Sequence, residues 1–156
     1  MKHLRKLMAM VMLLTTVMLL AACGGKEETV TYYNKLDQEG VIIEEWMTLH
    51  AKGDNVYRIG DTLIIDYSSH DAATQEVMAQ LYDEMAGMYQ AVEGVECTGE
   101  ASEGSYTLSF SFEVSKEILS ELSANNLFDV EEGAEGISLK ATKAQLESDG
   151  YTISER

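Results

Sequence analysis

The chain has 156 residues, 46% of them apolar, and a formal net charge of −16 at neutral pH. This charge disfavours nucleic acids and anionic lipid head groups as partners, because phosphate groups would be repelled. The apolar content and the absence of proline indicate a globular chain rather than a disordered one.

An apolar segment opens the chain. Lys2, Arg5 and Lys6 begin it, and the run from residue 7 to residue 22 is interrupted only by two threonines. This run is shorter than the ~20 residues that a membrane-spanning helix needs, and no second apolar stretch of that length follows. Residues 1–22 are therefore predicted to be a cleaved lipoprotein signal peptide.

The segment Leu20-Ala21-Ala22-Cys23-Gly24 has the form of a bacterial lipobox. The small alanines let a peptidase approach the backbone, and the Cys23 thiol can accept a diacylglyceryl group. Two palmitate-type acyl chains give stable attachment, at ~0.8 kcal/mol per buried methylene. A plain secretory signal is the alternative, but cysteine stands at the one position that lipidation requires. We expect Cys23 to be lipidated and the domain to be extracytoplasmic, anchored to the bacterial cell membrane.

The mature chain is more acidic than the precursor. Three of the 11 basic residues and none of the 27 acidic ones precede Cys23, so −19 remains after cleavage. Such a charge keeps a tethered protein soluble and does not by itself imply a cationic ligand. With Cys23 acylated, Cys97 has no intramolecular partner for a disulfide. Residues 23–28 are expected to form the lipidated cysteine and a short tether, and residues 29–156 a single domain.

The first half of the domain predicts an antiparallel meander. Residues 29–36 are rich in β-branched and aromatic side chains, residues 41–51 alternate between apolar and polar, and residues 56–67 form a third strand. Turn-forming sequences separate the three. Within the third strand, Gly60-Asp61 predicts a bulge or a sharp change of direction.

A long amphipathic helix is expected next. Residues 68–71 offer N-capping side chains, and Gly94 ends the apolar pattern. The apolar stripe could line a ligand groove, but packing against a sheet is favoured because methionine fills gaps in cores readily. The stripe consists of Val77, Met78, Leu81, Tyr82, Met85, Met88, Tyr89 and Val92.

Residues 95–101 and 106–114 predict a hairpin. The second of these strands has the clearest period-2 pattern in the chain, with aromatic residues on one face and hydroxyl residues on the other. Small residues of the first strand oppose the aromatics, which would fill the space above them. We expect Phe110 and Phe112 to face one side of the long helix, formed by Met78, Leu81, Met85 and Met88.

The rest of the chain predicts two short helices and two short strands. Ser115 can cap a helix through Leu122, residues 142–148 form a last helix, and residues 136–139 and 151–154 are short strands. The fold class is therefore α+β: a single domain with a mainly antiparallel sheet of about five strands, covered on one face by one long helix, with two short C-terminal helices.

An acidic loop lies between the two short helices. It lacks the alternating oxygen ligands of a calcium-binding loop, so a solvated turn is favoured over a cation site, which stays the alternative. Its acidic residues are Asp129, Glu131, Glu132 and Glu135.

Several short motifs resemble those of the YehR-like lipoprotein family in their order and spacing over nearly the whole chain. They are the lipobox, Lys52-Gly53-Asp54 with Val56, Tyr89 followed by Gly94-Val95-Glu96, and Ala144-Gln145-Leu146 with Gly150-Tyr151. The resemblance implies a single α+β domain of unknown function. It supplies no catalytic or cofactor residue.

The sequence contains no recognisable catalytic, cofactor or metal-binding motif. His50 could act as a base for Cys97, but an unpaired cysteine on an apolar strand face is more often a core residue. His70 beside Asp71 fits a helix-start turn better than a general base. We expect a non-enzymatic module that binds an unidentified ligand or envelope partner. An extracytoplasmic enzyme is the alternative, and it would bring two or more of these residues into one concave site.

Overall fold

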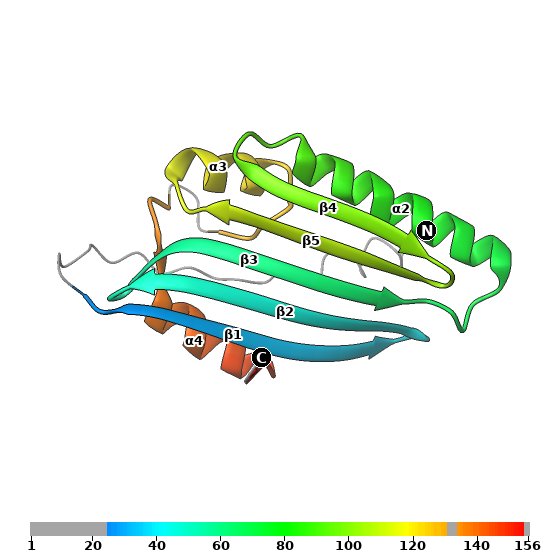
Figure 1. Cartoon of the computed structure of the whole chain (residues 1–156), viewed down its shortest axis with the longest axis horizontal. Helices are drawn as coiled ribbons and strands as arrows, with labels where there is room; N and C mark the ends of the chain where they lie inside the picture. Colours follow the sequence, from blue (N-terminus) through cyan, green and yellow to red (C-terminus); the bar gives the residue numbers. More distant parts are fainter. Residues whose placement is uncertain (1–24, 131–133, 155–156) are drawn as a thin grey trace.

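The computed structural model describes residues 25–130 and 134–154. One seven-stranded antiparallel sheet, in the order β4-β5-β3-β2-β1-β7 with β6 paired to β3, runs through the described part (Figure 1). The strands are β1 (Glu27–Gln38), β2 (Val41–Lys52), β3 (Asn55–Asp66), β4 (Val95–Ser102), β5 (Ser105–Glu113), β6 (Ile137–Ser138) and β7 (Thr152–Ile153). The helices are α2 (Ala72–Gln90), α3 (Lys116–Ala124) and α4 (Leu139–Ser148).

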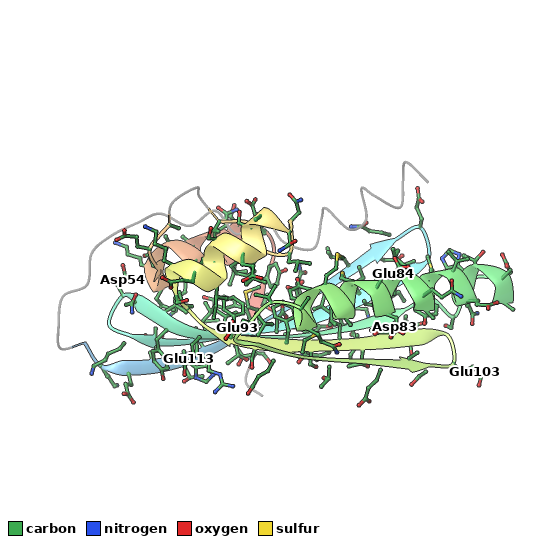
Figure 2. All side chains as sticks on the ribbon, turned by 90° about the horizontal axis from the view of Figure 1, so that it is seen from above. Asp54, Asp83, Glu84, Glu93, Glu103 and Glu113 are labelled. Carbon is green, nitrogen blue, oxygen red and sulfur yellow. The ribbon has the colours of Figure 1, made fainter. Side chains whose placement is uncertain are left out.

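All three described helices lie on one face of the sheet, and no described helix covers the other, which is called the uncovered face below (Figure 2). The α+β class and the antiparallel pairing are confirmed, but the expected five strands and single covering helix are wrong. Six strands side by side span ~24 Å, whereas a helix with its side chains is ~10 Å across, so α2 alone cannot cover them. The strands β6 and β7 have two residues each, which is too short to show any periodicity.

The third strand is continuous, and the bulge expected at Gly60-Asp61 is absent. Gly60 pairs with Thr48 of β2 and with Ser111 of β5 without a break in register. The irregularity in the β2–β3 ladder falls instead between His50 and Ala51. A glycine inside a strand can mark a bulge or a close approach to the backbone, and here the first of these is excluded.

The predicted hairpin of β4 and β5 is confirmed. Cys97 pairs with Phe110 and Gly99 with Leu108, so small residues oppose large ones as expected. A Cβ atom added to Gly99 would come within 2.0 Å of the Tyr106 hydroxyl oxygen. The glycine therefore lets Tyr106 cross β4 and donate a hydrogen bond to Asp83 of α2, at 2.9 Å.

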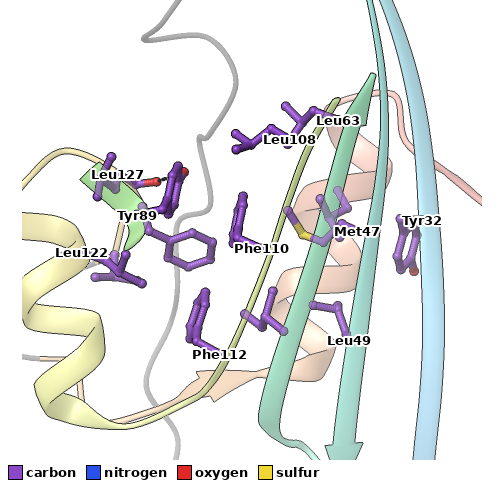
Figure 3. Packing of buried hydrophobic residues seen from close by; sticks show 14 of the residues in the cluster. Tyr32, Met47, Leu49, Leu63, Tyr89, Leu108, Phe110, Phe112, Leu122 and Leu127 are labelled. Carbon is purple, nitrogen blue, oxygen red and sulfur yellow. Dashed lines mark hydrogen bonds between the residues drawn. The ribbon is translucent and has the colours of Figure 1, made fainter. Parts of the chain in front are cut away.

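Helix α2 begins at its expected cap, since the Asp71 side chain accepts from the Thr74 amide at 3.1 Å. The stripe that it buries is narrower than predicted, and Met88 is 42% exposed. Phe110 stacks on Tyr89 at 4.3 Å between ring centroids, as Figure 3 shows. The buried residues of α2 are Met78, Tyr82, Ala86 and Tyr89.

Phe112 does not face α2 as expected. It packs edge-on against Phe128, with ring centroids 5.5 Å apart, in the segment that follows α3. The reason is the length of α2, which ends at Gln90 before it reaches this end of β5. The predicted short helices are both present, although α4 begins three residues early because Ser138 caps it.

We expect Phe110→Ala to lower the free energy of unfolding by ~3 to 5 kcal/mol, because it leaves a cavity beneath Tyr89. Ser111→Ala, on the uncovered face of the same strand, should change it by less than ~0.5 kcal/mol. Denaturant melts of the mature chain with Cys23→Ser measure both. Equal, small losses would show that β5 is not packed against α2.

Candidate functional site

The uncovered face of the sheet carries two cross-strand rows of polar side chains. In one row Trp46 of β2 stands beside Thr62 of β3 and Ser109 of β5. In the next row Thr48 and Ser111 stand on either side of Gly60. All six residues are half-buried. These three strands are paired on both sides, so the rows lie on a rigid part of the structure.

Gly60 leaves a gap in the second row. A Cβ atom added there would meet only the Ser111 Cβ, at 3.9 Å, which is an ordinary contact, and the backbone is not left-handed. Neither conformation nor close packing therefore requires glycine at this position. Glycine in a strand interior costs ~0.5 to 1 kcal/mol relative to alanine. Such a position often marks a place where a ligand approaches the backbone.

The gap forms the floor of a hollow of about 380 Å³, which lies in the range of ~300 to 1,000 Å³ typical of ligand pockets. Its walls combine one indole ring with several hydroxyl groups. The Thr62 and Ser109 hydroxyl oxygens lie 3.1 Å apart and bond each other. The Trp46 ring packs against Tyr33, with centroids 5.1 Å apart. The hollow is therefore preformed and both donates and accepts hydrogen bonds.

Two charged side chains stand at the rim of this hollow. Arg58 Nη2 donates to Ser111 Oγ at 3.2 Å and lies 3.5 Å from Glu96 Oε2. The two side chains are 46% and 83% exposed, so their ion pair contributes little to stability and either can turn toward a ligand. A second hollow, of about 540 Å³, is also lined by Arg58, Glu96 and Ser111 and extends to Ile118.

Two carboxyl groups are buried under the opposite, covered face. Glu45 and Asp61 are 2% and 3% exposed. The Tyr151 hydroxyl donates to Glu45 Oε2 at 2.7 Å, but with both carboxyls ionised the other three oxygens have no donor. Burial raises the pKa of both groups, and the charge of Glu45 raises that of Asp61 further. The pair therefore keeps a proton that one carboxyl donates to the other.

The residues considered for catalysis do not meet. His50 lies on the uncovered face near the end of β2, where its Nδ1 bonds the Thr29 hydroxyl at 3.1 Å. Cys97 packs against the core on the covered face, and burial raises the pKa of its thiol, which suppresses the reactive thiolate. His70 lies beside Gly40, at the other end of the sheet from His50.

The acidic loop is only partly within the described residues, since 131–133 lie outside them. Glu135 pairs with Lys116 at 3.4 Å, and Asp129 is exposed. Among the described residues, no group of three or more His, Cys, Asp or Glu side chains is placed to hold a metal ion. Cys23 also lies outside the described residues, so its lipidation stays a prediction.

Neither the Gly60 hollow nor the carboxyl pair was predicted from the sequence. A signal existed for each. Glu45 stands between Ile43 and Met47 on the apolar phase of β2, where a carboxylate has to be buried. Gly60 interrupts a strand whose other turn-forming residues, apart from its neighbour Asp61, stand only at the two ends. The two features occupy adjacent positions in β3, on opposite faces.

We expect Asp61→Asn to stabilise the protein at pH 7. The folded-state pKa of Asp61 is raised, so folding retains a proton that the unfolded chain releases, and stability falls as pH rises above 3.8. The asparagine amide does not titrate, so it removes this pH-dependent loss, and its N–H can donate to Glu45. The free energy of unfolding should therefore rise by ~1 kcal/mol or more at pH 7, and the increase should shrink toward pH 4.

Asp66→Asn on the same strand is the matched control for this measurement. Hydrogen bonds from Ser68 lower the pKa of Asp66, so this substitution should destabilise, and more at pH 7 than at pH 4. Denaturant melts at both pH values compare the two variants. A loss of stability for Asp61→Asn that is larger at pH 7 would contradict the shared proton.

None of the described helices is long and apolar enough to cross a bilayer. The NMR structure of the Escherichia coli YehR protein superposes with a TM-score of 0.59, at 21% identity, over 85% of this chain and 94% of that one. An NMR structure of a protein from Streptococcus pneumoniae TIGR4 superposes with a TM-score of 0.51, at 11% identity, over 88% and 91% of the two chains. These likenesses support the fold.

Sequence comparison assigns the family. An uncharacterized lipoprotein of Listeria monocytogenes, Lmo0207, is 29% identical over 97% of both chains. The profile of a protein family of unknown function, DUF1307, matches residues 28–152. Together with the likeness to YehR, this match confirms the expected YehR-like relationship, and the chain belongs to the DUF1307 family.

Proposed function

We propose that this protein is a lipid-anchored binding module of the bacterial cell envelope, which presents the uncovered sheet face to a ligand. The lipobox at Cys23 supports the anchor, and so does the name of the Listeria relative, a lipoprotein. The hollow over Gly60 supports ligand binding, and it is the observation that carries the proposal. A glycine that the fold does not need stands at the floor of a preformed, hydrogen-bonding hollow.

A lipid on Cys23 would bring the end of the domain at which β1 begins closest to the membrane. Strand β1 begins at Glu27, four residues after Cys23, which is a reach of ~14 Å. The Gly53 amide donates to the Lys26 carbonyl at 3.0 Å and ties the β2–β3 turn to the same end. Gly60 lies five residues along β3 from Asn55, or ~17 Å along the strand from that end. The anchor would therefore be attached well away from the hollow.

The module binds its ligand without transforming it. Among the hydroxyls that line the hollow, Thr62 and Ser109 bond each other, Thr48 bonds Thr31, and Ser111 accepts from Arg58 and donates to Glu96. The hydrogen bond of His50 goes instead to Thr29, which does not line the hollow, so it is not placed as a base for these hydroxyls. A nucleophilic serine needs a base within hydrogen-bond reach. The only described thiol, Cys97, has its side chain on the covered face. Recognition by hydrogen bonds and one aromatic ring is what this arrangement offers.

We expect Cys23→Ser to move the protein from the membrane fraction to the soluble extracytoplasmic fraction, since the two acyl chains supply the attachment. The fold should not change, because Cys23 precedes β1. Fractionation after detergent-free washing, with a denaturant melt of the released protein, measures both. A variant that stays firmly bound to washed membranes would show that Cys23 is not the anchor.

The hollow is tested by filling it. Gly60→Val should raise the free energy of unfolding by ~0.5 to 1 kcal/mol, because it removes an unneeded glycine from a central strand, yet it should abolish ligand capture. The matched control is Gly87→Ala on the exposed side of α2, where an added Cβ meets nothing within 4 Å. That control should also stabilise the fold and should leave capture intact.

The measurement compares the envelope components that the anchored parent, Gly60→Val and Gly87→Ala proteins retain from solubilised native envelopes. A component retained by the parent and by Gly87→Ala but lost by Gly60→Val supports the proposal. Identical retention by all three proteins would mean that the hollow is not a binding site.

A further inference from the structure

We propose that the hollow over Gly60 binds an uncharged glycan, with the Trp46 indole stacked on one pyranose ring. This inference rests on the proposed function and names the chemical class of its ligand. A pyranose has an apolar C–H face and a rim of hydroxyls, each of which both donates and accepts hydrogen bonds. The site must therefore offer one aromatic surface and several groups that can both donate and accept hydrogen bonds.

The lining of the hollow has this composition. Trp46 supplies the aromatic surface, and five hydroxyl residues from β2, β3, β4 and β5 line the hollow with it. A hydroxyl can switch between donating and accepting, which neither an ammonium nor a carboxylate can do. The five hydroxyl residues are Thr48, Thr62, Thr98, Ser109 and Ser111.

The aromatic surface is preorganised. The Trp46 ring packs on Tyr33 at 5.1 Å, with an interplanar angle of 43°. The Tyr33 hydroxyl donates to Glu44 Oε1 at 2.8 Å, and Lys35 also donates to that oxygen, at 3.2 Å. These bonds fix Tyr33 and, through it, Trp46. An immobilised ring loses little side-chain entropy when a ligand stacks on it.

Other ligand classes fit less well. A peptide that adds to a sheet needs an unpaired strand edge, whereas the strands β2, β3 and β5 beneath the hollow are paired on both sides. An anion would meet a single cation, Arg58, on a chain whose net charge is −16. A metal ion would need a cluster of ligands that the described residues do not contain. An uncharged, hydroxyl-rich molecule needs neither an unpaired strand edge, nor several cations, nor a cluster of metal ligands.

The ligand is longer than one ring. Both hollows, of about 380 and 540 Å³, are lined by Glu96 and Ser111 and therefore adjoin at these residues, so a ligand in the first can extend toward the second. Arg58 and Glu96 meet at this junction, and their exposed pair is weak enough to exchange for sugar hydroxyls. Hydrogen bonds from charged groups to hydroxyls are stronger than those between neutral groups.

Trp46 is the single tryptophan of the chain, so its fluorescence reports on this site alone. The lipidated mature protein is placed in nanodiscs of phosphatidylcholine, because glycoside detergents would compete for the site. It is titrated with maltotetraose, cellotetraose and tetra-N-acetylchitotetraose. The inference predicts a saturable change in Trp46 emission with at least one of the three.

The variants assign the response to the hollow. Calorimetry should show binding at least ~tenfold weaker for Gly60→Val and for Trp46→Ala, with Trp46→Phe between Trp46→Ala and the parent. Gly87→Ala should bind like the parent. Melts of each variant show that the fold is retained.

Two results would overturn the glycan assignment: no saturable response to any of the three sugars, or equal affinity of the parent and Gly60→Val. Failure of the underlying binding proposal looks different. If native envelope components still depend on the hollow while all three sugars fail, the binding module stands and the glycan class falls. If capture from envelopes is also insensitive to Gly60→Val, both fall.

Discussion

The pairing of β3 with β5 sets the register on which both faces of this protein depend. It places Leu63 beside Leu108 under the helices and Gly60 beside Ser111 on the uncovered face. A slip of one residue would move Phe110 into water and Ser111 into the core, because side chains alternate with a period of two. The same pairing joins the N-terminal meander to the β4–β5 hairpin in one sheet. The core and the hollow are therefore fixed by a single interaction.

Gly60 and Asp61 both lower the stability of the fold relative to other residues that these positions of β3 could hold. The glycine gives up a side chain that the backbone could carry, and the aspartate places a carboxyl in the core, where burial raises its pKa. Selection removes such features only when stability falls below what function needs, and they persist where function requires them. Glu45 reduces the cost of burying Asp61 by sharing a proton with it. Tyr151 donates a hydrogen bond to Glu45, which ties the segment after α4 to the centre of the sheet.

Local periodicity was enough to predict most elements of this fold, and long-range pairing was not. The alternation in residues 106–114, the amphipathic pattern of α2 and the caps Asp71 and Ser115 each lie within a short window. Each is present in the structure, although the buried stripe of α2 is narrower than predicted. The β3–β5 pairing, the two-residue strands and the cover by three helices depend on contacts between distant segments. Gly60-Asp61 was interpreted wrongly because a glycine in a strand has two local meanings, and only the neighbouring strands decide between them.

The position of the hollow limits how it can recognise a ligand. Its floor is the backbone of a central strand, and its walls come from strands paired on both sides, so binding requires no loop to close. Without closure a ligand stays partly in water, and affinity has to come from many modest contacts over an extended length rather than from one enclosed group. The strongly acidic chain removes anionic ligands from competition at long range. A rigid, shallow, hydroxyl-rich surface on an acidic domain is thus suited to the long neutral ligand that we propose, which would add contacts as it extends toward the second hollow.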